Sequence, residues 1–335
     1  MNSREWDGLI GHQDGSKIYH LYEWGILLNE VHGHRLVYLV ENGGVFPLAL
    51  VKSRVFGNRL ISLPFADYGG PCAKDRKTAE ALVLKAEEIA LELDVDFMET
   101  RCPDKDYSGI FEKEGFVRRD DYLTYLLSLD KELDELWRGI GDKNRNMVRK
   151  AERNNVEIKV AANKDDLREF YTLYLKTMKK LGSPPQPFKF FERMWSLFYP
   201  ENLLMPMAMH NGKCIASGIF FLHNGIIHHA YSCSLREGLK LAPNDLIQWQ
   251  VIKLGHEQGF KQLDFGRTRG DAGNVLFKRR WGAEVVKMPY YYKFYNTELK
   301  QRPEIKYRNL STLWSRYMPA FIANRIGPWL IKQIG

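Results

Sequence analysis

The strongest constraint on the fold is a series of secondary-structure signals that occurs twice along the chain. Each copy has two strand-like segments around an Asn-Gly turn, then an apolar-faced helix, a strand, a short helix and a last strand. The copies keep a constant spacing, because Phe111 and Phe277 are 166 positions apart and so are Arg101 and Arg267. We infer that the chain contains a duplicated domain.

Both copies switch between strand and helix periodicity in the same places. In the second copy, Ile247, Val251 and Leu254 recur at i, i+4 and i+7, which predicts an amphipathic helix that ends at Gly259. The elements expected in the first copy are 36–40, 46–52, 80–93, 96–101, 110–114 and 122–129. Those expected in the second copy are 203–209, 216–222, 226–232, 245–258, 261–265, 275–280 and 285–294.

This order of elements is that of the GNAT acyltransferase fold, in which two neighbouring strands splay apart to admit an acyl carrier. We therefore predict an α/β (α+β) protein with two tandem GNAT-like domains. Each is a mixed, mostly antiparallel sheet flanked by helices, and a helical segment ends the chain. The predicted boundaries are 1–135 for the first domain, 136–298 for the second, which holds the site, and 299–335 for the C-terminal segment.

Composition agrees with a two-domain globular protein. The chain has 335 residues, 44% hydrophobic and 27% charged, which suits two domains of about 150 residues. Its net charge of +8 permits an anionic partner but does not identify one. The four cysteines are far apart and no histidine cluster accompanies them, so we predict no metal, no disulfide framework and no cofactor. With no signal-peptide pattern and no run of 18 apolar residues, we expect a cytoplasmic protein.

The segment after Glu298 is strongly basic and rich in apolar residues. Its apolar spacing predicts one or two amphipathic helices. They either pack back on the first domain or lie on a membrane surface, as a peripheral contact at its inner face. The basic residues, against Glu304 alone, are Lys300, Arg302, Lys306, Arg308, Arg316, Arg325 and Lys332.

A basic stripe is expected on the helix between the two copies. Arg145, Arg149 and Arg153 recur at i, i+4 and i+8 and therefore share one helix face. Such runs are usually solvated, but three arginines with few acidic partners favour an anionic ligand. We predict that Arg145 and Arg149 bind an anionic acceptor.

The glycine-containing stretch from Leu263 to Glu284 is not a nucleotide-binding loop. Its glycines fit neither G-x-G-x-x-G nor a P-loop, and we expect a tight loop between a strand and the short helix. Leu263 and Phe265 should face the core. Arg267 is the polar exception in this loop, and we predict that it helps to bind a donor substrate.

The second half contains the motifs KNRNMVRKAERNNVEI, KLAPNDLIQWQVIKLGHEQGFKQLDFGRT and FKRRWGAE, and the first half contains FADYGGPCA. Together these motifs resemble the FemAB-like aminoacyltransferases. The second half resembles the second domain of that family, and the first half resembles the branch that accompanies exosortase (PEP-CTERM) and exopolysaccharide systems. The resemblance implies two tandem GNAT-like domains and aminoacyl transfer from aminoacyl-tRNA to an amine of an anionic cell-envelope precursor. It implies no metal.

Two other functions remain open from the sequence. One is a CoA-dependent N-acyltransferase of the same fold, which would hold the pyrophosphate on an Arg/Gln-x-x-Gly-x-Gly/Ala turn at a helix N-terminus. Here Arg236 and Gly238 are only two positions apart, and Pro243 follows, so the signature is broken. A large donor such as tRNA is therefore favoured. The other is a non-catalytic binding protein.

The resemblance also implies that a Phe-Lys pair contacts the aminoacyl end of the tRNA, and here the pair is Phe277-Lys278. Between the copies, the sequence after the shared phenylalanine changes from Glu-Lys-Glu to Lys-Arg-Arg. This asymmetry predicts that the second copy holds the anionic donor. We expect Lys278 to be the catalytic cation, Phe277 to stack on the terminal adenine, and Arg279 and Arg280 to contact phosphates.

The proton of the attacking amine needs a route, and no Ser-His-Asp or Cys-His order is visible. Asp264 is the predicted base, with Asp245 as the alternative that more readily caps its helix. Tyr231 lies on the strand expected at 226–232, and we predict a role for it in catalysis and in acceptor binding. His228 and His229 precede it on this strand, where at least one should point inward, and we expect a satisfied core histidine there.

Overall fold

The chain divides into two units, whose bounds differ from the predicted domains. The computed structural model describes residues 2–11, 13, 15–53, 56–102, 107, 109–270, 275–296 and 320–334. One unit comprises residues 1–122 and 287–335, and the other comprises residues 123–286. The bounds of the units differ from the predicted domain bounds because the last strand of each sequence copy ends in the other unit. Residues 123–128 complete the sheet of the second unit, and residues 290–294 complete that of the first.

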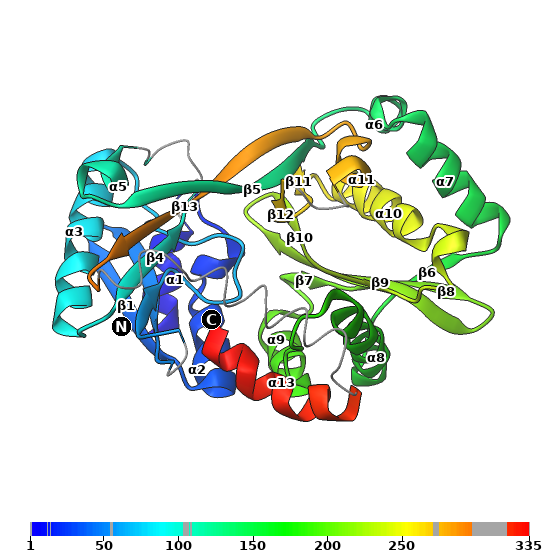
Figure 1. Ribbon diagram of the computed structural model, residues 1–335. Coiled ribbons are helices and arrows are strands. Elements are labelled where there is room, and N and C mark those ends of the chain that lie inside the picture. The colour runs from blue at the N-terminus through cyan, green and yellow to red at the C-terminus, as the bar shows by residue number, and fades with distance from the viewer. Residues whose placement is uncertain are drawn as a thin grey trace. The chain divides into compact units, whose positions relative to one another are not determined.

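The first unit contains a mixed sheet (Figure 1). Its neighbouring strands are antiparallel except for one parallel pair, β3 with β4. The Asn42-Gly43 turn joins the first two strands, and both residues have positive φ, as two-residue hairpin turns of this kind require. In spatial order, the strands are β1 (Arg35–Glu41), β2 (Gly44–Val51), β3 (Arg59–Ile61), β4 (Phe97–Arg101) and β13 (Glu284–Phe294).

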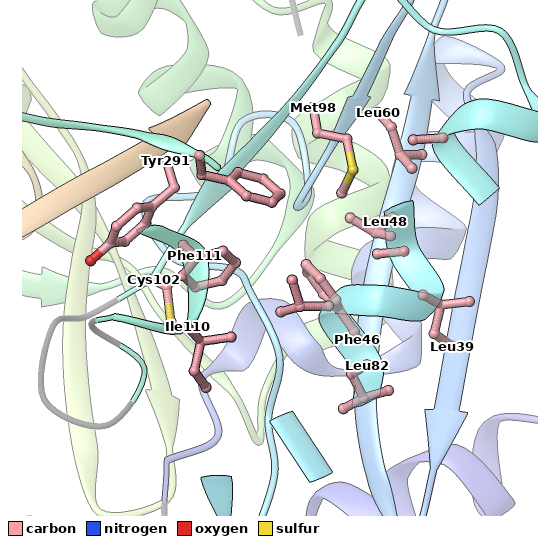
Figure 2. Packing of buried hydrophobic residues seen from close by; sticks show 14 of the residues in the cluster. Leu39, Phe46, Leu48, Leu60, Leu82, Met98, Cys102, Ile110, Phe111 and Tyr291 are labelled. Atoms are coloured by element: carbon pink, nitrogen blue, oxygen red, sulfur yellow. The ribbon is translucent and has the colours of Figure 1, made fainter. Parts of the chain in front are cut away.

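Helix α3 (Arg76–Glu92) packs on β1 and β2 and closes the core of the first unit. It begins at the N-cap Asp75, whose side chain accepts a hydrogen bond from the Thr78 N–H at 2.8 Å. Figure 2 shows the core, in which the rings of Phe111 and Tyr291 are stacked at 4.6 Å. The other helices of this unit are α1 (Ser3–Ile10), η1 (Ile18–His20), α2 (Tyr22–His32) and α5 (Ile110–Lys113).

The C-terminal helix α13 (Ala320–Ile334) belongs to the first unit. The buried Arg59 guanidinium donates hydrogen bonds to the carbonyls of Gln333 and Ile334, both at 2.6 Å. These are last-turn carbonyls, which an α-helix leaves without partners of its own. The remainder of the predicted C-terminal segment, residues 299–319, lies outside the described residues.

The second unit repeats the strand order of the first. A hairpin, β8 with β9, is followed by β10, by β11 parallel to β10, and by the end of β5 antiparallel to β11. This arrangement confirms the predicted mixed, mostly antiparallel sheet. The strands are β5 (Val117–Ser128), β6 (Glu157–Val160), β7 (Leu203–Leu204), β8 (Pro206–His210), β9 (Lys213–His223), β10 (Ile226–Ser234), β11 (Gln262–Asp264) and β12 (Thr268–Arg269).

Helix α10 (Pro243–Glu257) is the apolar helix predicted from the sequence, but its N-terminus differs from expectation. Ala242 is the N-cap, with φ of 56°, and makes no side-chain cap. Asp245 therefore lies inside the first turn and does not cap the helix, because Pro243 fits the first helical position. The other helices are α6 (Leu133–Gly139), α7 (Asp142–Arg153), α8 (Lys164–Leu181), α9 (Phe188–Phe198), η2 (Leu239–Leu241) and α11 (Val275–Arg279).

Among the described helices of both units, none combines the length and the apolar character needed to cross a membrane.

Candidate functional site

The second unit contains a pair of parallel strands that separate. Strands β10 and β11 pair from Ile226 with Gln262 to His228 with Asp264, and within the described residues the ladder ends there. Beyond this point β10 continues beside β9, while the chain after Asp264 turns at Gly266, which has φ of 72°. Glycine tolerates this left-handed conformation.

A β-bulge lies on β10 just beyond the last pair. The register with β9 shifts between His229 and Tyr231, so Ala230 has no residue opposite it. The Tyr231 ring is half-buried and makes edge-to-face contacts with Phe191 at 5.3 Å and with Tyr174 at 6.3 Å. Bulges redirect side chains and increase local twist.

Asp264 is buried and accepts hydrogen bonds on both carboxylate oxygens. Its Oδ1 accepts from Thr124 Oγ1 at 2.5 Å and from the Gly266 N–H at 2.9 Å. Its Oδ2 lies 3.0 Å from Nδ1 of the buried His228. A carboxylate held in this way fixes the Gly266 turn. The geometry favours a positioning role for Asp264 over the predicted role of general base.

Lys278 on α11 is buried against the same turn. Its Nζ donates a hydrogen bond of 2.6 Å to the Gly266 carbonyl and lies 6.0 Å from the centre of the Tyr125 ring. Burying an ammonium group is costly unless polar partners accept its protons. The Asp264 network holds the carbonyl that orients Lys278, so the cation has a defined position beside the separating strands.

His229 is neutral in this environment. Burial lowers its pKa to about 3, and the positive charges of Lys278 and His228 lower it further in the same direction. Its ring stacks on Phe220 at 4.1 Å and hydrogen-bonds with the side chain of Gln248. The prediction of a core histidine agrees with this packing, and the proximity to Lys278 was not visible in the sequence.

The buried polar atoms of this unit that have no hydrogen-bond partner within the described residues include Tyr125 OH, Gln248 Nε2, Thr268 Oγ1 and Trp281 Nε1. Tyr125 lies beside Lys278, and Gln248 contacts His229. Buried polar groups are nearly always satisfied in folded proteins. The Tyr125 hydroxyl, beside Lys278, and the Gln248 amide, beside His229, are therefore two groups that a polar ligand could satisfy.

The predicted donor residues lie on the same segment. Phe277 is half-buried, with its ring edge-to-face on Trp281 at 6.0 Å, while Arg279 is exposed. Arg280 is half-buried, and its carbonyl accepts a hydrogen bond from the Gly141 N–H at 2.7 Å. Arg267 directly follows the Gly266 turn and is half-buried. Residues 271–274, between Arg267 and α11, lie outside the described residues.

The predicted acceptor residues on α7 have partners within their own unit. Arg145 forms an ion pair with Asp142 and donates a hydrogen bond of 3.4 Å to the Arg138 carbonyl. The exposed Arg149 places its guanidinium 5.5 Å from the centre of the Trp137 ring. Asp142 precedes Arg145 by three positions, and this helical spacing was a sequence signal for their ion pair. Gly141 connects the start of α7 to Arg280, so the two basic segments are adjacent.

Asp245 is a titratable group that sequence reasoning assigned to capping. Burial raises its pKa to about 7, against the opposing effects of a hydrogen bond from its own backbone and of the charges of Lys143 and Arg280. Its carboxyl therefore changes protonation near neutral pH, unlike an ordinary aspartate. This shift had no sequence signal, because it depends on how deeply the first turn of α10 is packed.

Residues 142–293 match the family described as acetyltransferase (GNAT) domain. Together with the sheet topology, this match assigns the chain to the class of GNAT-like folds. The tandem architecture agrees with a tandem GNAT protein from the clavulanic acid biosynthesis pathway, which has a TM-score of 0.56 at 14% identity and covers 88% of this chain and 96% of that one.

Within this class, the chain is similar to proteins named for aminoacyl transfer. It is 24% identical over 113 residues to a UDP-N-acetylmuramoylpentapeptide-lysine N(6)-alanyltransferase of Weissella viridescens, a match to 32% of this chain and 34% of that protein. The match thus spans about a third of the length of this curated relative.

Solved structures of similar fold include FemX, with a TM-score of 0.71 at 15% identity, which covers 90% of this chain and 98% of that one. They also include L-PGS from Bacillus licheniformis, with a TM-score of 0.62 at 14% identity, covering 94% and 98%.

Proposed function

We propose that the protein transfers an aminoacyl group from aminoacyl-tRNA to an amine of a cell-envelope precursor. The observation that carries this proposal is the buried Lys278, held by the Gly266 carbonyl where β10 and β11 separate. The name of the alanyltransferase, with the resemblance of the motifs to FemAB-like enzymes, supports aminoacyl transfer over other acyl transfers. The acceptor is a peptidoglycan-type peptide or, as the exosortase-associated branch suggests, an exopolysaccharide-related amine.

The reaction needs a neutral amine to attack the ester carbonyl of the donor. A C–N bond forms, the carbonyl oxygen becomes an oxyanion, and the ester C–O bond then breaks to release the ribose oxygen. Lys278 supplies a fixed positive charge for the oxyanion, a contribution typically worth about 2.7–4 kcal/mol for one donor. Because Gly266 O already orients the Nζ group, little reorganisation is needed when the negative charge develops.

The attacking amine must lose a proton, and the leaving ribose oxygen must gain one. Both carboxylate oxygens of Asp264 are engaged in the network, so Asp245 is better suited than Asp264 to act as the general base. Burial raises its pKa to about 7, which is close to the ideal for a general base at neutral pH. Asp245 also lies near Arg280, two positions from Lys278.

Donor and acceptor would meet different groups of the second unit. Arg279 and Arg280, with Arg267, would contact tRNA phosphates, and Phe277 would stack on the terminal adenine, worth about 1–3 kcal/mol. Tyr231, Arg145 and the exposed Arg149 would bind the acceptor. We place the activity in the cytoplasm, at the inner face of the membrane.

A CoA-dependent N-acyltransferase is the second candidate, because the matched domain family is described as an acetyltransferase. The N-terminus of α10 argues against it. Pro243 occupies the first position of this helix and has no N–H, which removes one of the backbone donors that a CoA pyrophosphate would use.

The test is an incubation of the protein with a pool of charged tRNAs and with peptide or sugar-amine acceptors, read by product mass. The proposal predicts an aminoacylated acceptor that forms only when the tRNA is charged. Parallel calorimetry with acetyl-CoA should show no binding. Acyl transfer from acetyl-CoA, with no product from any charged tRNA, would contradict the proposal and favour the CoA enzyme.

A further inference from the structure

A buried tyrosine of the second unit lies beside the candidate site without a role in the account so far. Tyr125 on β5 is fully buried, and its hydroxyl has no hydrogen-bond partner within the described residues. A hydroxyl buried in this way gives up its hydrogen bonds to water and gains none in return, which destabilises the folded protein. A catalytic role and a bound water are two of the few explanations for such a group.

Tyr125 lies level with the point where β10 and β11 separate. Its carbonyl accepts a hydrogen bond of 3.0 Å from the Phe265 N–H. This bond comes directly after the last ladder pair of β5 with β11, which is Leu126 with Asp264. Within the described residues, the ladder of β10 with β11 also ends at Asp264. Tyr125 is therefore the residue of β5 at the place where the two parallel strands part.

The Tyr125 side chain shares a face of the sheet with the Lys278 ammonium group. Side chains alternate between the two faces along a strand. Leu126 is paired with Asp264, and Thr124 donates a hydrogen bond to the Asp264 carboxylate, so these residues are on one face. Tyr125 points to the other face, where the Lys278 Nζ lies 6.0 Å from the centre of its ring. The Asp264 network thus supports the Gly266 turn from one face, and the hydroxyl and the ammonium group are on the other.

We propose that the Tyr125 hydroxyl donates a second hydrogen bond to the oxyanion that Lys278 stabilises. When the amine attacks, the C–N bond forms and the carbonyl π electrons move to oxygen, which accepts the hydrogen bond. The hydroxyl keeps its proton, and the carbonyl forms again when the bond to the leaving group breaks. Tyr125 therefore ends the reaction unchanged. A donor that is already buried and in place needs little reorganisation when the negative charge develops.

This inference rests on the proposed acyl transfer, but not on the identity of the donor. An ester of tRNA and a thioester of CoA both give an oxyanion when an amine attacks their carbonyl carbon. The same substitution can therefore be tested with either donor.

The experiment compares single-turnover transfer by the unmodified protein and by Tyr125→Phe, which removes only the hydroxyl. We expect the chemical step to slow by about 100-fold with donor affinity unchanged, because the oxyanion exists only after the amine attacks. The melting temperature of the free variant should be equal or higher, because phenylalanine buries no unpartnered polar atom. A tyrosine with a purely structural role would not combine slower transfer with undiminished stability.

The matched control is Tyr38→Phe in the first unit. The hydroxyl of the half-buried Tyr38 donates a hydrogen bond of 3.3 Å to the Tyr22 carbonyl. Loss of this partnered hydroxyl should lower the melting temperature slightly and leave the transfer rate unchanged.

Transfer by Tyr125→Phe at the unmodified rate would overturn the inference, since that result is expected of a hydroxyl that only holds a buried water. Slower transfer with a lowered melting temperature would also overturn it, because the hydroxyl would then have a partner inside the folded protein. If product forms from acetyl-CoA and from no charged tRNA, the proposed function fails, and the same comparison with acetyl-CoA decides the role of Tyr125. Product from neither donor would overturn both.

Discussion

At the scale of single residues, Asp264 decides how the candidate site is organised. We predicted it as a base, and the hydrogen bonds that it accepts from Thr124 and Gly266, with its contact with His228, lead us to propose that it supports Lys278 instead. The sequence placed Lys278 and Asp264 in one short stretch, and this was correct. It contained no signal for Thr124, which comes from a strand 140 positions earlier.

Asp264→Asn should lower kcat more than it raises KM. The amide keeps the shape of the side chain but converts one acceptor into a donor, which weakens the hold on the Gly266 turn and misplaces Lys278. We expect a loss of about 10–100-fold in kcat, since small misplacements near the reacting atoms are costly. If Asp264 positions Lys278, kcat should fall by the same factor at all pH values and should still change with pH near 7. Disappearance of that pH step would instead identify Asp264 as the base.

Two buried histidines should make the protein less stable in acid. Burial lowers the pKa of His34 to about 3, with His32, Lys332 and Arg59 acting in the same direction, and the pKa of His229 is also about 3. Between pH 6.5 and 3 the unfolded chain therefore binds protons that the folded chain does not. The free energy of unfolding falls as pH falls through this window, by up to about 1.4 kcal/mol per pH unit for each histidine.

Urea denaturation at several pH values checks this expectation. His34→Gln should reduce the pH dependence of the first unit and leave the contribution of His229 in place. A variant with the same slope as the unmodified protein between pH 6 and pH 4 would show that His34 is protonated in the folded state.

At the scale of elements, the sequence predicted the type and the order of the helices and strands, but not which strands pair with each other. The Asn42 and Asn211 turns carried their own signals, and both residues adopt the positive φ that such hairpins require. The end of β5 and the end of β13 have equivalent patterns, yet each completes the sheet of the other unit. Alternation of apolar residues sets which face of a strand is buried and says nothing of which strand lies beside it.

The bulge at Ala230 was also missed, because it carries no glycine or proline. It arises from how β10 must twist between its two neighbours, which is a property of the assembled sheet.

Arg59→Met should release the C-terminal end of α13. The change removes two charge-assisted hydrogen bonds to Gln333 and Ile334 while keeping an apolar side chain of similar length. We expect a loss of about 2–4 kcal/mol of local stability. Hydrogen exchange should become faster in residues 326–334, with β2 and β4 as internal controls. Unchanged protection in this helix would show that Arg59 does not anchor it.

At the scale of the whole molecule, the net charge of +8 fits an anionic partner. The segment after Phe277 is proposed to bind tRNA. The duplication itself was predictable because the 166-residue spacing is a property of the sequence. The sequence revealed the functional difference between the two copies only in part, through the change from Glu-Lys-Glu to Lys-Arg-Arg.

Arg280→Ala should weaken tRNA binding and reduce its dependence on salt. Each phosphate contact releases about one counterion, so the slope of log affinity against log salt concentration should fall by about 0.7–0.9. Filter binding of a charged tRNA across a salt series measures this slope. Lys85→Ala, which changes an exposed lysine on α3 of the first unit, is the control and should leave the slope unchanged.

The most direct test of the central claim is single-turnover transfer from a charged tRNA by the unmodified protein and by Lys278→Ala. Removal of one oxyanion-stabilising group should slow the chemical step by about 100-fold or more, with donor affinity nearly unchanged. Melting curves confirm that the variant is folded. Full transfer activity in a folded Lys278→Ala protein would contradict the account.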